Sequence, residues 1–392
     1  MAGTQLMEPD LELIREVRKA GGNSLKKCFQ CATCSVICNL SPNDKPFPRK
    51  EMILAQWGQT EKLVKDPDVW LCHQCNDCST YCPRGARPGD VLAAIRSQIY
   101  KHFAFPSFMG KALANPIALP VLFLVPVMIL LGCIYLFAPP APNGGFLFMQ
   151  AGQSIDFNIF LPHSSVDALF VIGNILIFAF AAVGFVRFWK ALQDGGGKSE
   201  RSFVSALLLT VKEFILHRLF NKCEANKSRA LWHMVLFFGF AGAMITTGCI
   251  FVFVFAPHYL HLLGLESLEP FFAVPIDLPH PVKILGALSG LALVAGGGML
   301  VIRRLTNKDN VGANGYTDYL FLYIMFFTGL TGMLSWLTRL SGVPLLAYVN
   351  YFIHLVFVFV LLWYMPYSKF AHMFYRTLAL THAKQHGRYP RM

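Results

Sequence analysis

Six apolar runs fill most of the sequence after residue 112 and constrain the fold more than any other feature. A helix needs about 20 apolar residues to cross a bilayer, and only helices or closed barrels satisfy their backbone polar groups in lipid. Residues 203–220 are also apolar, but Lys212, Glu213, His217 and Arg218 interrupt them, which predicts an amphipathic helix along the membrane interface. The sequence therefore predicts an all-α membrane domain with six spans, at residues 117–138, 166–189, 230–256, 282–302, 319–337 and 346–367.

Eight of the eleven cysteines stand in two runs with the spacing C-x2-C-x2-C-x3-C. In two-cluster ferredoxins this spacing holds [4Fe–4S] clusters, and the fourth cysteine of each run ligates the other cluster. Structural zinc is the alternative for paired C-x2-C elements, but a four-cysteine run that occurs twice favours two clusters. We predict that Cys28, Cys31, Cys34 and Cys82 hold one cluster, and that Cys72, Cys75, Cys78 and Cys38 hold the other.

The cysteine runs define a head whose composition differs from that of the rest of the chain. Residues 1–112 mix charge, proline and cysteine, and we expect them to form a helical two-cluster ferredoxin domain. Residues 113–380 would be the membrane domain and residues 381–392 a tail. Within the head we expect helices at 49–64 and 88–100, the second capped by Asp90, and a helix beginning at the fourth cysteine of each run. His73 is expected at the surface, because cysteines already complete the ligand sets.

The basic residues predict the orientation of the chain in the membrane. They crowd the connection between spans two and three and follow spans four and six, whereas residues 139–162 and 257–281 contain no Lys or Arg. The positive-inside rule then places the head, both termini and the basic loops in the cytoplasm. The N-terminus has no secretory signal pattern, so we expect a multi-pass protein of the cytoplasmic membrane. The net charge of +12 follows from this topology, and no nucleic-acid partner is expected.

Histidines at the spans are the candidate haem ligands, because polar groups in lipid are costly and usually functional. His354 and His372 are 18 residues apart, which is five turns and about 27 Å if one helix joins them. That spacing suits two b-type haems stacked across the membrane. His233, at the cytoplasmic start of span three, is the expected partner of His372. His280 is the leading candidate partner of His354.

Other polar residues near the spans have two interpretations each. His258 and His261 are weaker candidates for the outer haem. Arg229 could contact a haem propionate or a quinone, or simply anchor the chain by the positive-inside rule. Lys283 and Arg339, the basic residues near the outer surface, could contact a quinone or a propionate, or could snorkel to the headgroups. The sequence leaves these alternatives open.

Two segments of the chain resemble known redox proteins. Residues 25–100 resemble the iron–sulfur C subunit of heterodisulfide reductases, through Val69-Trp70-Leu71-Cys72 and Cys82-Pro83-Arg84-Gly85. Residues 165–375 resemble the cytochrome b subunits of that enzyme and the gamma subunit of respiratory nitrate reductase. The matching motifs there are Arg229-x-x-Trp232-His233, Gly239-Phe240 and Pro366-Tyr367-Ser368-Lys369-x-x-His372.

The fusion of both modules is similar to the membrane subunit of the quinone-interacting membrane-bound oxidoreductases of sulfate reducers. That resemblance implies two b haems, menaquinol oxidation, and flavin- and iron–sulfur-containing partner subunits that pass electrons toward adenylylsulfate reductase in sulfate respiration. In the nitrate reductase pattern both ligand helices carry two histidines, whereas the third span here carries only His233.

We therefore expect an electron-transfer subunit of an oxidoreductase complex. Electrons would pass between menaquinone and a soluble partner through haem and the two clusters, and the sequence allows either direction. One alternative is a heterodisulfide reductase-like membrane subunit of another anaerobic respiratory complex. The other, of a different class, is a redox sensor or transporter without catalytic electron transfer.

Overall fold

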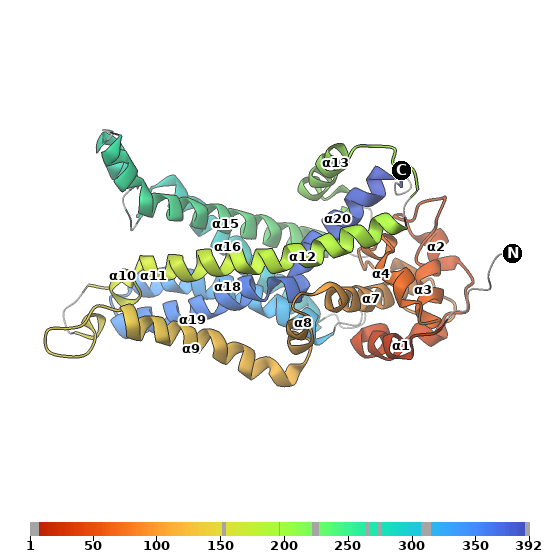
Figure 1. Ribbon diagram of the computed structural model, residues 1–392, viewed down its shortest axis with the longest axis horizontal. Coiled ribbons are helices and arrows are strands. Elements are labelled where there is room, and N and C mark those ends of the chain that lie inside the picture. The colour runs from red at the N-terminus through yellow and green to blue at the C-terminus, as the bar shows by residue number, and fades with distance from the viewer. Residues whose placement is uncertain are drawn as a thin grey trace.

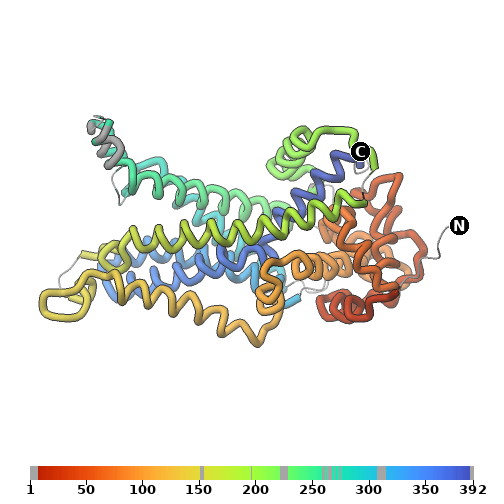
Figure 2. Tube along the Cα trace, viewed as in Figure 1, coloured from red at the N-terminus to blue at the C-terminus, as the bar shows by residue number. Residues whose placement is uncertain are grey.

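The protein consists of a long helical bundle with a smaller helical head at one end (Figure 1). The computed structural model describes residues 8–150, 154–195, 197–221, 227–263, 266–272, 274, 276–306 and 315–388. Within these ranges the only β-type pairing is an isolated bridge between Pro140 and Phe146. The predicted all-α class is confirmed. Helix α1 (Leu11–Val17) and helix α20 (His372–Gln385) both belong to the head end of the molecule (Figure 2).

Short helices build the head around the two cysteine runs. Besides α1 they are α2 (Thr33–Ile37), α3 (Arg49–Gln56), α4 (Thr60–Val64), α5 (Asp68–Leu71), α6 (Asp77–Thr80), α7 (Pro88–Phe103) and α8 (Ser107–Leu113). Helix α7 is the central element, because it contacts α1, α3, α5 and α6 in the head and α12 in the bundle. Its start suits a proline, because the first backbone N–H groups of a helix have no intrahelical acceptor.

Six helices are long and apolar enough to cross a membrane among the described residues. Consecutive spans pack side by side, since α15 contacts α16, α16 contacts α18, and α18 contacts α19. The chain is therefore a multi-pass membrane protein, as predicted. The helices that carry the spans are α9 (Leu119–Phe137), α11 and α12 (His163–Asp167 and Gly173–Asp194, joined by a π-turn), α15 (Lys227–Leu262), α16 (Pro281–Thr306), α18 (Tyr316–Leu340) and α19 (Pro344–Trp363).

The head and the bundle share one hydrophobic core. Trp70 of α5 stacks on Tyr375 of α20 at 5.5 Å between ring centroids, and it meets Phe188 of α12 edge-on at 5.8 Å. Tyr100 and Phe103 of α7 complete this aromatic cluster. The core crosses the expected boundary at residue 112, and α20 crosses the one at 380. The domain limits therefore stay predictions, and residues 389–392 of the tail lie outside the described part.

The expected helix at 49–64 is wrong in one respect, because it is broken at Gly58. This glycine has a positive φ of 60°, and a Cβ there would lie 2.5 Å from the backbone oxygen of Asp10. The backbone N–H of Asp10 donates to the Gly58 carbonyl at 3.0 Å. Contact with the segment before α1 therefore ends α3 and separates it from α4, and local helix propensity does not reveal such a contact.

The last predicted span also ends earlier than expected, and no single helix joins His354 to His372. Helix α19 stops at Trp363, and two 3₁₀ turns, Met365–Tyr367 and Lys369–Ala371, lead into α20. Pro366 lies in the first turn, where its ring prevents an α-helix from continuing. The estimate of five helical turns between the two histidines is therefore wrong.

The apolar segment 203–220 forms two helices, α13 (Phe203–Leu216) and α14 (Arg218–Asn221). They meet at His217, which has a left-handed backbone conformation with φ 49°. Helix α13 packs on α20, and Lys384 donates to the Leu209 carbonyl at 2.7 Å. Val204 and Leu208 are exposed on its other face, which leaves an apolar surface available for lipid. The interfacial position stays a prediction.

Candidate functional site

The two cysteine runs adopt the same unusual backbone conformation. In the first run Gln30 and Ala32 have positive φ values of 62° and 68°. The equivalent residues of the second run, Gln74 and Asn76, have 53° and 69°. Left-handed conformations cost free energy in residues other than glycine and persist where function requires them. Each loop is thereby curled so that its first three cysteines can face one point.

The structure gathers the cysteines into two groups of four. Burial and the neighbouring thiols of Cys28, Cys31 and Cys82 raise the pKa of Cys34 to about 11. Such mutual effects require short distances. Cys82, the last cysteine of the second run, is therefore placed with the first three of the first run.

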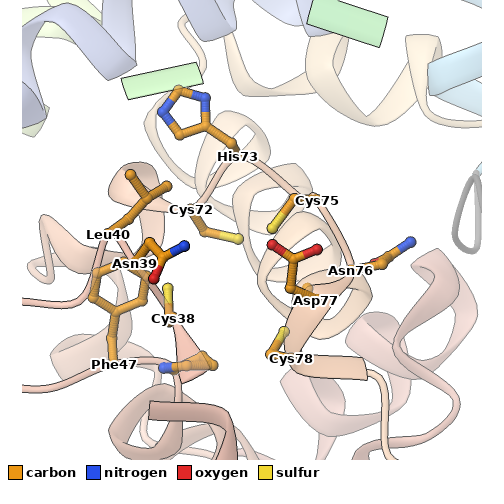
Figure 3. A pocket seen from close by; sticks show the side chains of 12 residues that line it. Cys38, Asn39, Leu40, Phe47, Cys72, His73, Cys75, Asn76, Asp77 and Cys78 are labelled. Carbon is orange, nitrogen blue, oxygen red and sulfur yellow. The ribbon is translucent and has the colours of Figure 1, made fainter. Parts of the chain in front are cut away.

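The second group mirrors the first. Burial and then the thiols of Cys72 and Cys75 raise the pKa of Cys38 to about 12, and burial with Cys72, Cys75 and Cys38 raises the pKa of Cys78. Figure 3 shows the sulfur atoms of all four turned into one pocket. Each group supplies the four thiols that a [4Fe–4S] cluster needs. The ligand assignment stays a prediction that this grouping supports.

We expected a helix to begin at the fourth cysteine of each run, and the structure shows that neither Cys38 nor Cys82 begins one. Cys34 and Cys78, the third of each run, lie on α2 and α6, whereas Cys38 directly follows α2. Asp90 is not a helix cap either. It lies in the first turn of α7, where it forms an ion pair with Arg87 at 2.7 Å and accepts a hydrogen bond from the Gln74 side chain at 3.1 Å. Asp90 thus braces the second cysteine loop.

The two cysteine groups differ in their surroundings. Cys31 of the first group is exposed, and beside it Phe29 is 67% exposed beneath the Arg84 guanidinium, 4.1 Å from the ring centroid. The loop of the second group faces the membrane half of the molecule instead. His73, between Cys72 and Cys75, stacks on Phe220 of α14 at 5.2 Å. The prediction of a surface position for His73 is wrong, because the loop docks on helices distant in the sequence.

Three arginines hold this second loop by its backbone carbonyls. Arg96 of α7 donates to Val69 O at 2.8 Å and to Cys72 O at 3.3 Å. Arg229 of α15 donates to Gln74 O at 2.8 Å and to His73 O. Arg376 of α20 donates to Leu71 O at 3.4 Å, and its Nη2 is 2.5 Å from His73 Nε2. Arg229 was expected at a propionate, a quinone or the interface, and the structure places it against the cysteine loop.

The ring of Phe220 lies between the cysteine loop and the histidines of the bundle. Its centroid is 5.2 Å from that of His73 and 5.3 Å from that of His233 on α15. His217 lies 5.7 Å from His233 between ring centroids, and the Nδ1 atoms of both are buried without a hydrogen-bond partner among the described residues. Sequence reasoning missed His217, Phe220 and Arg376 as site residues. Arg376 follows His372 by four residues, a helical spacing that could have indicated it.

His233 and His372 are brought together as expected. They lie within electrostatic range of each other, and both are partly buried. His372 Nδ1 donates to the Lys369 carbonyl at 2.6 Å, and Lys369 forms an ion pair with Asp318. Burial lowers the pKa of His372 to about 4, so the imidazole is neutral. A neutral imidazole whose Nδ1 is fixed by a carbonyl offers Nε2 as a metal ligand. These features suit a metal-ligating imidazole, and a b haem held by His233 and His372 stays a prediction.

The structure does not bring His354 and His280 together. Both α16 and α19 begin at the end of the bundle away from the head (Figure 1). His354 lies ten residues beyond Pro344, about 15 Å along α19, whereas His280 immediately precedes α16. His280 Nε2 is 3.2 Å from Phe271 O, and its Nδ1 accepts from Val282 N at 3.2 Å. Both ring nitrogens of His280 are therefore engaged by backbone.

The remaining predicted residues lie at that same end or outside the described part. Lys283 of α16 lies over the Trp336 ring, 5.0 Å from its centroid, and within electrostatic range of Arg339 of α18. They are far along the bundle from the cysteine loops. His261 is exposed near the end of α15, and the side chain of His258 lies outside the described part.

Together the fold and the site define a multi-pass membrane protein with a dicluster iron–sulfur head. Residues 24–86 match the model of the 4Fe-4S dicluster domain, which supports two [4Fe–4S] clusters on the eight cysteines. Residues 112–392 match the family model described as citrate utilization protein B. The chain belongs to the citrate utilization protein B family.

Curated relatives match the whole chain or the head alone. The "Citrate utilization protein B" of Escherichia coli is 28% identical over 396 residues, which cover 96% of this chain and 92% of that protein. The C subunit of the H(2):CoB-CoM heterodisulfide,ferredoxin reductase of Methanothermobacter marburgensis is 34% identical over 110 residues, which cover 26% of this chain and 59% of the relative. A protein of Archaeoglobus profundus that is described as similar to the C subunit of heterodisulfide reductase is 33% identical over 113 residues, 29% of this chain and 58% of the relative.

The predicted likeness of the head to the C subunits of heterodisulfide reductases is therefore confirmed, and it spans less than two thirds of those relatives. No solved structure matches this chain.

Proposed function

We propose that this chain is the membrane subunit of an oxidoreductase complex and passes electrons between menaquinone and soluble flavin- and iron–sulfur-containing partner subunits. The observation that carries the proposal is a series of ring contacts. His73 stacks on Phe220 and Phe220 meets His233 edge-on, with 5.2 and 5.3 Å between successive ring centroids. This series joins the second cysteine group to the bundle histidines through a continuous run of side chains. A sensor or a transporter has no need for such a junction.

The residues give the path an order. His233 and His372 would hold a b haem at the head end of the bundle, and that haem supplies one-electron chemistry in contact with the quinone pool. The group of Cys38, Cys72, Cys75 and Cys78 comes next, because its loop lies on Phe220. The group of Cys28, Cys31, Cys34 and Cys82 comes last, because Cys31 is exposed and can face a partner.

A second haem on His354 and His280 has less support than the first. Backbone groups engage both nitrogens of His280, and the two residues do not meet. His354 is held by Thr331, whose Oγ1 is 3.1 Å from Nδ1, an arrangement that suits an oriented ligand as well as a packed polar residue. Lys283 and Arg339 would serve a quinone headgroup or lipid phosphates at that end of the bundle.

The chemistry of the soluble partner is the open part of the proposal. The resemblance to the sulfate-reducer complex favours electron transfer toward adenylylsulfate reductase. The match of residues 112–392 to a family named for citrate utilization favours a second candidate, a partner dehydrogenase acting in the use of citrate. Electrons would then run toward the quinone. In both cases the distribution of basic residues favours a cytoplasmic head and a chain that spans the cytoplasmic membrane.

Spectroscopy of the purified protein tests the proposal. We expect b-type haem absorbance that a menaquinol analogue reduces, and about eight non-haem irons from two cubane clusters. His233→Ala and His372→Ala should each lose the same haem, while His163→Ala, an exposed histidine near the end of the bundle away from the head, should lose none. A haem-free protein would refute the membrane half of the proposal, and loss of different haems would refute the pairing. Mass spectrometry of co-purified subunits would separate the two candidate partners.

A further inference from the structure

We propose that Arg96, Arg229 and Arg376 raise the reduction potential of the cluster held by Cys38, Cys72, Cys75 and Cys78, and that the membrane half of the chain thereby tunes the head. The inference rests on the cluster assignment in the proposed function. The three arginines do not ligate the cluster, and they contact the backbone of the loop that carries Cys72 and Cys75.

The three arginines converge on one short stretch of backbone from three separate helices. Their guanidinium groups bond carbonyls between Val69 and Gln74, five contacts in all, and Arg376 also contacts the His73 ring. All three are partly buried, and each acts electrostatically on His73. Only Arg96 belongs to the head. Arg229 starts the third span and Arg376 lies on α20, the helix that follows the last span, so two of the three charges come from the part of the chain after the head.

The electrostatic consequence follows from the charge of the cluster. A [4Fe–4S] cluster with four thiolate ligands is anionic and becomes more negative on reduction, so nearby positive charge favours the reduced state. Partial burial strengthens the effect, because a charge in a low-dielectric site is screened less than one in water. The second cluster would be exposed to three such charges at once.

The first cluster lacks this arrangement among the described residues. Arg49 acts electrostatically on Cys31, which is exposed to solvent. Arg84 lies over the exposed Phe29 ring at 4.1 Å. Water and salt screen charges in such positions. Arg84 is therefore the matched control, an arginine of the same head that should tune its cluster little.

The test is a potentiometric titration of the full-length protein in detergent with chemical mediators, followed by electron paramagnetic resonance of each reduced cluster. Arg229→Gln and Arg376→Gln should each change the oxidised-to-reduced ratio of the second cluster about tenfold at a fixed potential, a downward shift of about 59 mV for a one-electron couple. The signal of the first cluster should keep its midpoint. Arg84→Gln should leave both midpoints unchanged.

Lysine variants separate charge from architecture. Arg376→Lys keeps the charge but loses the planar fork, so its midpoint should stay close to that of the unmodified protein and show only a small part of the shift expected for Arg376→Gln. Equal shifts in the lysine and glutamine variants would overturn the proposal, as would equal shifts of both clusters or no shift. Iron analysis checks that each variant holds both clusters. If a glutamine variant loses iron, Arg96→Gln, which removes a charge supplied by the head itself, decides the question. The mediators exchange electrons with the clusters without quinone, so the midpoint potentials can be measured even in a protein that fails to react with menaquinol.

Discussion

Replacing Trp70 tests whether the head and the membrane half form one folding unit. The Trp70 side chain is 1% exposed and contacts Tyr375, Phe188 and Tyr100 at 5.5 to 5.8 Å between ring centroids. Truncating a buried tryptophan to alanine costs about 3–5 kcal/mol, of which each aromatic pair contributes about 0.5–1.5 kcal/mol beyond area burial. Trp70→Ala should therefore destabilise the fold by about 3–5 kcal/mol. The milder Trp70→Phe should cost about 1–2 kcal/mol, because it leaves a smaller cavity.

The assay is guanidinium-induced unfolding in detergent, followed by far-ultraviolet circular dichroism, for Trp70→Ala, Tyr375→Ala and the double variant. The stacked pair predicts a coupling energy of about 0.5–1.5 kcal/mol. Trp57→Ala is the control, since Trp57 is 52% exposed and its loss should change stability by about 0.5 kcal/mol or less. Additive effects of the two substitutions, or two separate unfolding transitions in the unmodified protein, would refute a shared core.

Three further predictions concern the head. Cys38→Ser should alter the resonance signal of the cluster held by Cys72, Cys75 and Cys78 and spare the other, and the reverse result would refute the crossed ligation. Gly58→Ala should cost about 1–3 kcal/mol in the same unfolding assay, because φ is 60° and its Cβ would meet Asp10. Burial raises the pKa of Glu51 well above its usual value, so its contribution to stability is full below about pH 4.5 and falls as pH rises through the raised pKa. Thermal melting measured from about pH 4.5 upward should show that Glu51→Gln abolishes this loss of stability with rising pH. An unchanged pH profile of the melting temperature would mean that another group causes it.

The features that could be predicted from the sequence are those set by local chemistry. Spans depend on runs of apolar residues, so the run at 282–302 became a helix from Pro281 to Thr306 within a few residues of expectation. The structure also brings Cys82 close to Cys34, as the predicted crossed ligation requires, because ferredoxin spacing determines how such loops curl. The two loops repeat their left-handed residues at equivalent positions, which the repeated motif encodes directly.

The features that could not be predicted depend on contacts between distant segments. Nothing near His73 in the sequence indicates Phe220 or Arg376, which are about 147 and 303 residues away. Gly58 breaks a helix because Asp10 packs against it. The turn at Pro366 does have a local signal, since proline disfavours a continuing helix. The prediction of one helix from His354 to His372 followed the spacing of the histidines, whereas the helix end at Trp363 reflects the proline.

The contacts between the head and the bundle explain why a ferredoxin head and a membrane bundle share one chain. Electron transfer in series requires each cofactor to stay at a fixed distance from the next, and a docked soluble ferredoxin would meet that requirement only while bound. Here Trp70 lies in a core built with α12 and α20, and Arg229 and Arg376 hold the adjacent cysteine loop from the membrane side. The loop that meets the bundle is thereby held by side chains of α15 and α20, while Cys31 of the other group is exposed. In the proposed path, the cluster on the held loop would exchange electrons with the bundle and the cluster beside Cys31 would exchange them with a soluble partner, so both ends of the path would lie in this chain.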